Sequence, residues 1–262
     1  MEMDGEDLGD KFLGCIVNFC QPSEWSRGPK LTEVSDLLRN SVKDGRVGIT
    51  IGCHPHFADQ MSEQRWEQFE VLISSPSRWF PWLRVVAVGE CGLDYSEKNS
   101  VPRVIQVKVF VRQVKLALKY NMSIVLHVRE AEQEALSILQ HIGVPEDFPI
   151  HRHCYSGDLN NARSWLSNYS ECKLGFTGLI TYSHSTQVQR VVKWVPEDKF
   201  LLETDSPYMI PVGATRNRMN CSFPGHVVHV AAKIGELKGL STDTILIKNI
   251  ENSKKIYNKF FN

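Results

Sequence analysis

No stretch of this sequence approaches the roughly 20 consecutive apolar residues that a membrane-spanning helix requires. The N-terminal segment MEMDGEDLGD is acidic and polar, so it lacks the apolar centre of a secretory signal peptide. An excess of charge of one sign is also missing, because Lys and Arg together number 30 and Asp and Glu together number 30. We therefore expect a protein of the cytoplasm or nucleus that is not secreted and has no membrane partner. Bulk charge neither supports nor excludes nucleic acid as a partner.

Paired cysteines and glycine-rich phosphate loops are missing as well. The seven cysteines are scattered, most of them within apolar runs, and no Cys-x-x-Cys pair occurs. This distribution predicts a reduced protein without a disulfide framework. No glycine-rich turn follows the first apolar run. That absence argues against a doubly wound open sheet, which is the rival arrangement among α/β folds.

Short β-branched runs alternate with amphipathic stretches along nearly the whole chain. Seven runs have the character of strands, at 14–20, 47–52, 84–89, 123–127, 149–153, 172–176 and 200–204. Apolar residues recur at helical spacing at 31–42, 104–118, 188–195 and from 241 onward, and Ser62 opens a further helix. This alternation predicts parallel strands with crossover helices, and 262 residues suit one α/β barrel, for which about 250 is typical.

A closed (β/α) barrel has eight strands, one more than the seven runs found here. Residues 1–13 are rich in acidic side chains and contain Gly5 and Gly9, so they cannot form a buried strand. We therefore expect a TIM-like (β/α) barrel that lacks its first strand. Residues 14–262 would form this domain, and residues 1–13 would be an acidic segment outside it.

Four of the predicted strands end in a side chain that can bind a metal ion: Glu90, His127, His153 and Asp205. In a (β/α) barrel the carboxyl ends of the strands meet at one face, where catalytic groups lie. A lone histidine at a strand end is more often structural, but four equivalent positions favour a metal centre. Two imidazoles with carboxylates suit Zn, Mn or Fe, and Mg if water completes the shell. Glu90 has two oxygens and could bridge two ions.

Three neighbouring side chains have two interpretations each. Arg129 could hold a phosphate through its two-pronged guanidinium, or could simply pair with Glu130 at a helix start. His54 could contact substrate or could be a structural loop histidine. His151 shares a face with His153 but lies about 7 Å deeper at the usual rise of a strand, which favours a supporting role.

Six motifs together resemble the TatD family of metal-dependent deoxyribonucleases. They are GCHPHF (52–57), GECGLDY (89–95), LHVRE (126–130), HCYSG (153–157), LGFTG (174–178) and ETDSPY (203–208). The resemblance runs from about Gly14 to the C-terminus, with the motifs in order on successive strands. It implies a barrel of the metal-dependent hydrolase type that cleaves phosphodiester bonds of DNA, often as a 3′–5′ exonuclease.

The resemblance also implies roles for single residues. Glu90 matches a carboxylate that bridges two metal ions, and His127 and His153 match the histidines of the second metal site. Asp205 matches an aspartate of the first site that also orients the attacking water. His54 matches a histidine near the substrate.

The family's N-terminal Asp-x-His-x-His strand has no counterpart among the nine histidines of this sequence. We therefore expect about one tightly bound divalent ion (Mg, Mn or Zn) rather than two, and reduced nuclease activity on DNA or RNA. Two alternatives stay open. One is an impaired or truncated form that binds metal, nucleic acid or a partner without turnover, and the other is a barrel hydrolase acting on amide or phosphotriester bonds. The oligomeric state has no signature in the sequence.

Overall fold

The computed structural model describes residues 14–25, 47–75, 84–214 and 220–261. The predicted helix at 31–42 and the acidic segment 1–13 lie outside the described residues. All seven predicted strands are present, and their order in the sheet is their order in the chain. They are β1 (Cys15–Phe19), β2 (Val47–Ile51), β3 (Arg84–Asp94), β4 (Ser123–Arg129), β5 (Ile150–Arg152), β6 (Cys172–Phe176) and β7 (Phe200–Leu202).

The chain divides into two compact units between Ile150 and His151. The first unit comprises the described residues of 14–150 together with Tyr257 and the short C-terminal helix α11 (Asn258–Phe261). The second unit comprises the described residues of 151–256.

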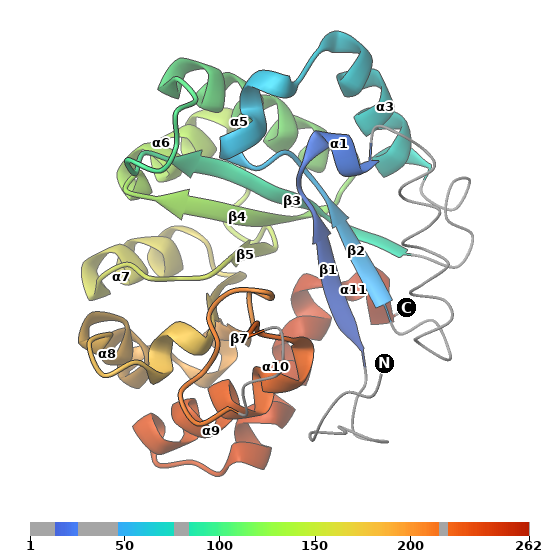
Figure 1. Ribbon diagram of the computed structural model, residues 1–262. Helices are drawn as coiled ribbons and strands as arrows, with labels where there is room; N and C mark the ends of the chain where they lie inside the picture. The colour runs from blue at the N-terminus through green and yellow to red at the C-terminus, as the bar shows by residue number, and fades with distance from the viewer. Residues whose placement is uncertain (1–13, 26–46, 76–83, 215–219, 262) are drawn as a thin grey trace. The chain divides into compact units, whose positions relative to one another are not determined.

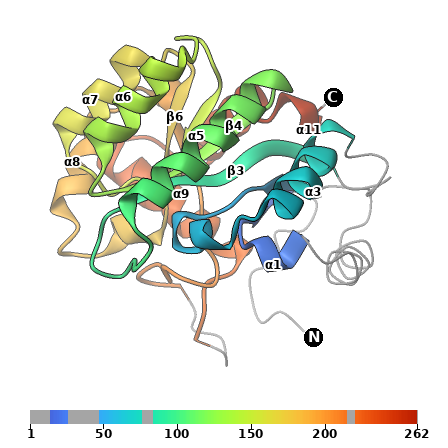
Figure 2. The ribbon, with the colours of Figure 1, turned by 90° about the horizontal axis from the view of Figure 1, so that it is seen from above.

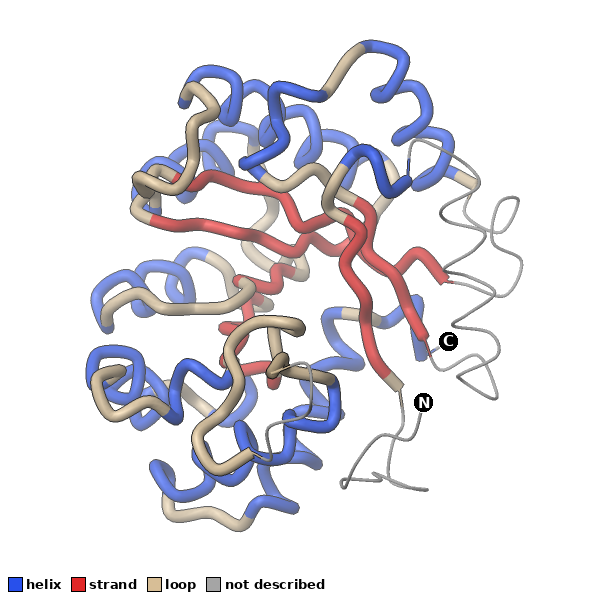
Figure 3. The backbone as a smooth tube through the Cα atoms, viewed as in Figure 1, coloured by secondary structure: helices blue, strands red, loops and turns tan. Residues whose placement is uncertain are grey.

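The first unit is built on four parallel strands. Each pairs with the next one in the chain, β1 with β2, β2 with β3 and β3 with β4, and Figure 3 shows them side by side. Every residue of β2 is buried, as are ten of the eleven residues of β3. This burial explains why VGITI and RVVAVG are continuous apolar runs, since a parallel sheet is covered on both faces.

Helices α3 (Glu63–Ser74), α5 (Arg103–Lys119) and α6 (Glu132–Ile142) cover this sheet. They contact β2, β3 and β4 respectively and lie on one side of these strands in Figures 1 and 2. The predicted cap of α3 is confirmed, because the Ser62 hydroxyl accepts a hydrogen bond from the Arg65 amide. The unit also contains the short helix α1 (Pro22–Trp25) and the 3₁₀ helix η2 (Pro55–Gln60).

Two strands continue past their predicted ends. β3 continues to Asp94 rather than ending at Gly89, so Glu90 lies within the strand and not after it. β4 continues to Arg129, so His127 does not close its strand. The apolar run stops at each of these residues while the backbone pairing goes on, since Gly92 pairs with His127 and Asp94 with Arg129.

The second unit pairs β6 with β7 in parallel and surrounds them with helices. These are α7 (Leu159–Asn168), α8 (Thr186–Trp194), α9 (Val227–Lys238) and α10 (Thr242–Ile256), with the 3₁₀ helices η3 (Gly178–Thr181), η4 (Glu197–Lys199) and η5 (Pro224–His226). The helices predicted at 188–195 and after 241 are confirmed as α8 and α10. Buried Asn252 of α10 donates hydrogen bonds to the carbonyl oxygens of Glu197 and Phe200, both at 2.8 Å, which ties α10 to the start of β7. Among the described helices, none combines the length and apolar character needed to cross a membrane.

The core of the first unit depends on Phe110 of α5, whose side chain is fully buried. We expect Phe110→Ala to lower the free energy of unfolding by about 3–5 kcal/mol, because it removes buried apolar surface and leaves a cavity. Urea unfolding followed by circular dichroism measures the change. Val104→Ala on the same helix is the matched control, because Val104 is 74% exposed, and its effect should stay within about 0.5 kcal/mol. Equal losses in the two variants would contradict this description of the core.

Candidate metal centre

The four predicted ligands are shared between the two units. Glu90 and His127 belong to the first unit, whereas His153 and Asp205 belong to the second. In each unit the predicted ligands lie in a group of histidines and carboxylates whose donor atoms are close enough to bind one ion.

In the first unit this group consists of His54, Glu90 and His127, here called the first cluster. Their donor atoms all lie within 4.8 Å of one another. The imidazole rings of His54 and His127 are 4.2 Å apart between centroids, and His127 Nδ1 lies 3.9 Å from Glu90 Oε2. The turn GCHP brings His54 here at the start of η2, so a residue predicted to contact substrate lies beside two predicted metal ligands.

Buried Asp94 fixes the ring of His127. Its Oδ2 atom lies 3.1 Å from His127 Nε2 and 3.0 Å from His56 Nε2, and its Oδ1 atom accepts hydrogen bonds from the amide and hydroxyl of Ser96. Burial raises the pKa of Asp94, but the bonds from His127 and Ser96 outweigh burial and hold this pKa well below its usual range. Asp94 is therefore a carboxylate that accepts a hydrogen bond from His127 Nε2–H, which leaves Nδ1 directed at Glu90.

Asn18 of β1 orients Glu90 from the other side. Its amide nitrogen donates a hydrogen bond of 2.6 Å to Glu90 Oε1, and its amide oxygen accepts one of 2.7 Å from the Thr50 hydroxyl. The orientation of the amide follows from its partners, because a carboxylate can only accept and Thr50 donates here. Asn18 and Thr50 are directly paired across β1 and β2, so the backbone register sets this contact.

The glycine of ECGLDY permits the close approach of β3 and β4. Gly92 has φ +146°, and a Cβ atom there would lie 1.9 Å from the carbonyl oxygen of His127. Any larger residue would push β4 away and move the His127 ring from Asp94. The motif therefore supplies three things: Glu90, the carboxylate of Asp94 that orients His127, and a glycine that lets β4 approach β3.

The second unit holds a group of His151, His153, Cys154, Glu203 and Asp205, here called the second cluster. Its donor atoms form two overlapping triplets, His151–His153–Glu203 and His153–Cys154–Asp205, each within 4.8 Å. His153 Nε2 lies 3.4 Å from Asp205 Oδ1, so two predicted ligands are neighbours here. Asp205 has φ +51°, a left-handed conformation that Asp tolerates better than most residues.

Glu203 holds both histidines of the second cluster. Its Oε1 atom lies 2.7 Å from His151 Nε2 and accepts a hydrogen bond of 3.1 Å from the Cys154 amide, and its Oε2 atom contacts His153 Nδ1. Burial raises the pKa of Glu203, but the charges of His153 and His151 and their hydrogen bonds bring it well below its usual range. His151 thus supports Glu203, in agreement with the supporting role predicted for it.

Gly175 of LGFTG makes room for this carboxylate. A Cβ atom at position 175 would lie 1.3 Å from Glu203 Oε1 and 2.5 Å from His151 Nε2. Burial raises the pKa of the Cys154 thiol to about 12, and a protonated thiol is a poor metal ligand. The other donor groups of the second cluster are imidazoles and carboxylates.

Sequence reasoning missed Asn18, Asp94 and Glu203. Asp94 and Glu203 lie inside the motifs GECGLDY and ETDSPY, which also contain the predicted ligands Glu90 and Asp205. A carboxylate four residues after Glu90, or two before Asp205, lies on the same face of an extended strand, and that signal could have identified both. Arg129 is exposed at the end of β4, where its backbone is in register with that of Asp94 in β3.

The donor sets fit a divalent ion. Each cluster joins imidazole nitrogen to carboxylate oxygen, a combination suited to Zn, Mn or Fe. In each, a second carboxylate holds the other nitrogen of a predicted histidine ligand, Asp94 for His127 and Glu203 for His153. Such carboxylate–histidine pairs fix the tautomer and raise the basicity of a metal ligand.

Solved structures identify the class. The TatD homologue YJJV of Escherichia coli K12 superposes with a TM-score of 0.77 at 25% identity, covering 94% of this chain and 86% of that one. A TatD family hydrolase of Entamoeba histolytica has the same fold, with a TM-score of 0.78 at 20% identity over 92% and 83% of the two chains. The fold is therefore that of the metal-dependent hydrolases with TIM-barrel architecture.

Within this class the chain belongs to the TatD-related DNase family, whose model matches residues 13–258. It is 32% identical over 247 residues to the human 3′-5′ RNA nuclease TATDN2, covering 94% of this chain but 30% of the human protein. The metal-dependent hydrolase YabD of Bacillus subtilis is 33% identical over 92% of this chain and 86% of its own length. The 3′-5′ ssDNA/RNA exonuclease TatD of Erwinia amylovora is 29% identical over 79% and 77% of the two chains.

The position of Asp94 leads to a prediction about metal affinity. Asp94→Ala should weaken binding of Mn²⁺ or Zn²⁺ by about 10–100-fold, because His127 loses the carboxylate that orients its ring. Isothermal titration of the metal-free protein measures the affinity. Glu67→Ala is the matched control, because Glu67 is exposed on α3 of the same unit. An unchanged affinity in a folded Asp94→Ala protein would exclude the orienting role.

Proposed function

We propose that this chain is a divalent-metal-dependent nuclease that hydrolyses phosphodiester bonds of DNA or RNA from the 3′ end, in the cytoplasm or nucleus. The observation that carries the proposal is the carboxylate–histidine pair in each unit, beside the predicted ligands Glu90 and Asp205. The relatives named as 3′-5′ nucleases for RNA, or for single-stranded DNA and RNA, support the substrate class and the direction.

In this proposal Glu90 and His127 of the first cluster and His153 and Asp205 of the second are metal ligands, and the metal is Mg, Mn or Zn. When bound, the ion lowers the pKa of a coordinated water and neutralises charge on the phosphate. Asp205 orients the attacking water and accepts its proton through a carboxylate oxygen. Glu203 and Asp94 keep their histidines in the orientation that binding needs.

Two further side chains are proposed to contact the substrate. His54 lies beside Glu90 and His127, so it can donate a hydrogen bond to a phosphate oxygen next to the ion. Arg129 is exposed at the end of β4, two residues beyond His127, and its guanidinium suits two-pronged binding of the next phosphate.

A second candidate function is metal or nucleic-acid binding with little turnover. It is favoured by the sequence, which contains no Asp-x-His-x-His motif to complete a second metal site. Such a chain would bind about one ion and cleave slowly.

Activity is the first test. Single-stranded DNA and RNA, labelled at either end, should be shortened from the 3′ end with Mg²⁺ or Mn²⁺ and left intact with EDTA. Glu90→Gln and Asp205→Asn should each lower the rate by about 100-fold or more, because a proton acceptor or metal ligand is lost. Glu97→Gln is the matched control, since Glu97 is exposed in the loop after β3. Full activity in both site variants would assign the reaction to other residues, and metal binding without cleavage would favour the second candidate.

The number of ions is the second test. Elemental analysis of the purified protein should find about one tightly held ion per chain, because the sequence contains no Asp-x-His-x-His motif to supply the histidines of a second ion. Asn18→Ala removes the hydrogen bond that orients Glu90 and should weaken ion binding, whereas Asn160→Ala, at an exposed position of α7, should not. Two tightly held ions in the unaltered protein would contradict the single-ion proposal.

A further inference from the structure

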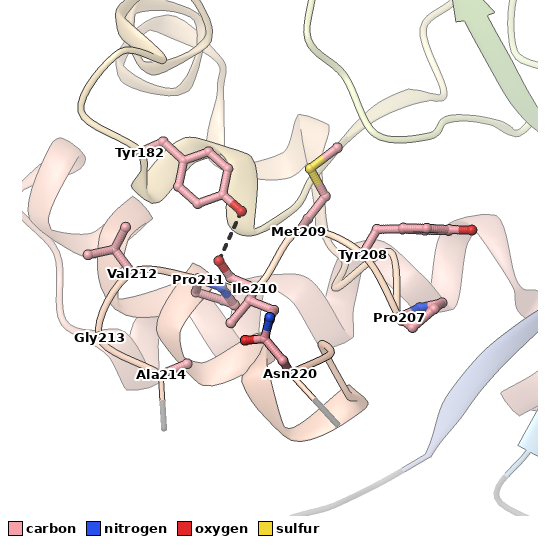
Figure 4. Close-up of a pocket in the computed structure, with 10 residues that line it drawn as sticks. All are labelled: Tyr182, Pro207, Tyr208, Met209, Ile210, Pro211, Val212, Gly213, Ala214 and Asn220. Atoms are coloured by element: carbon pink, nitrogen blue, oxygen red, sulfur yellow. Dashed lines mark hydrogen bonds between the residues drawn. The ribbon is translucent and has the colours of Figure 1, made fainter. Parts of the chain in front are cut away.

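A pocket of about 640 Å³ lies in the second unit, along the loop of residues 207–214 that follows Asp205 (Figure 4). Its lining includes Tyr182, Tyr208, Met209, Ile210, Val212 and Asn220. The volume falls within the range of about 300–1,000 Å³ that is usual for small-ligand sites. None of these residues has a role in the function proposed above.

The loop is tied down along its length. The Tyr182 hydroxyl donates a hydrogen bond of 3.0 Å to the Ile210 carbonyl, drawn as a dashed line in Figure 4. The Val212 amide donates to the Thr181 hydroxyl at 2.8 Å, and the Ser222 amide donates to the Pro207 carbonyl at 2.9 Å. A backbone held at three points is largely preformed, so binding to it loses little conformational entropy.

Tight packing at one glycine adds to this anchoring. A Cβ atom at Gly178 would lie 1.9 Å from the carbonyl oxygen of Met209, so η3 and the loop are in direct backbone contact. Met209 itself has φ +56°, a conformation that a non-glycine residue adopts only when its surroundings enforce it. Strained residues of this kind cluster at ligand sites.

The anchored loop keeps large side chains in water. Tyr208 is 69% exposed and Val212 is 63% exposed, although both are large apolar or aromatic residues. An exposed aromatic face is a surface on which a flat, partly apolar group can stack. The exposed amide of Asn220 both donates and accepts hydrogen bonds, as recognition of the edge of a base requires.

One lining residue of the pocket lies in the same turn as a predicted catalytic residue. The Tyr208 amide donates a hydrogen bond of 2.8 Å to the Asp205 carbonyl. Asp205 Oδ1 in turn lies 3.4 Å from His153 Nε2. A strand bound with a phosphate at Asp205 therefore has its neighbouring sugars and bases on the side of this loop.

We propose that this pocket binds one unpaired nucleobase of the substrate strand, stacked on Tyr208 and bonded at its edge by Asn220. The inference rests on the proposed nuclease function and assigns Tyr208 and Asn220, outside the two clusters, to binding of the substrate strand. A base paired in a duplex cannot present both its face and its edge, so duplexes are bound less well.

Equilibrium binding tests the proposal without turnover. Fluorescence anisotropy in EDTA compares a short labelled single strand with the same strand carrying abasic sugars. Tyr208→Ala should weaken binding of the base-containing strand about tenfold, because one base–aromatic stack is worth roughly 1–3 kcal/mol. Binding of the abasic strand should stay unchanged, and Tyr208→Phe should restore normal affinity for both.

The matched control is Ile247→Ala, an exposed apolar residue elsewhere in the second unit. It should bind both strands as the unaltered protein does, and thermal unfolding confirms that each variant is folded. Equal affinity of the unaltered protein for the two strands would overturn the proposal, as would normal binding by Tyr208→Ala. Preference for an apolar peptide over the oligonucleotide would overturn it too.

Cleavage measured separately with Mn²⁺ distinguishes this inference from the function on which it rests. If the unaltered protein prefers bases through Tyr208 but cleaves nothing, the pocket assignment stands and the nuclease proposal fails. If it cleaves base-containing and abasic strands at equal rates and binds them equally, the nuclease proposal stands and the pocket assignment fails.

Discussion

The contact between a buried carboxylate and the far nitrogen of a histidine organises both candidate clusters. Asp94 makes it with His127, and Glu203 makes it with His153. Each carboxylate side chain is almost entirely shielded from water. The hydrogen bonds and charges around it hold its pKa below the usual range, and the carboxylate therefore stays charged. A charged, immobile acceptor fixes the direction of the imidazole ring. The lone pair of the other ring nitrogen then points toward the remaining donors of the cluster.

Much of the fold could be predicted from the sequence, because apolar runs and helical spacing report directly on burial. β6 matches its predicted range, and α8 and α10 lie where the spacing of apolar residues indicates. The errors arose where backbone pairing continues past the last apolar residue, as it does through Glu90 in β3 and His127 in β4. When strands are predicted from apolar runs alone, a polar residue inside a parallel strand is taken for the end of that strand.

The neighbours within each cluster could be predicted for a similar reason, since strand position brings Glu90 close to His127 and His153 close to Asp205. Their supporting residues could not, because Asn18, Asp94 and Glu203 act through side-chain contacts that depend on register between strands. The clearance at Gly175 is likewise visible only when Glu203 and His151 have coordinates. The sequence gives the type of each residue, whereas the partner of its side chain depends on how distant segments pair in the fold.

The length of β3 has one more consequence. Glu90 and Asp94 stand on one strand, four residues apart, so their spacing is set by the rise and alternation of an extended backbone. A single inserted or deleted residue between them would turn one of the two carboxylates to the opposite face. A change of length between positions 90 and 94 would therefore turn away one of the two carboxylates that lie beside His127.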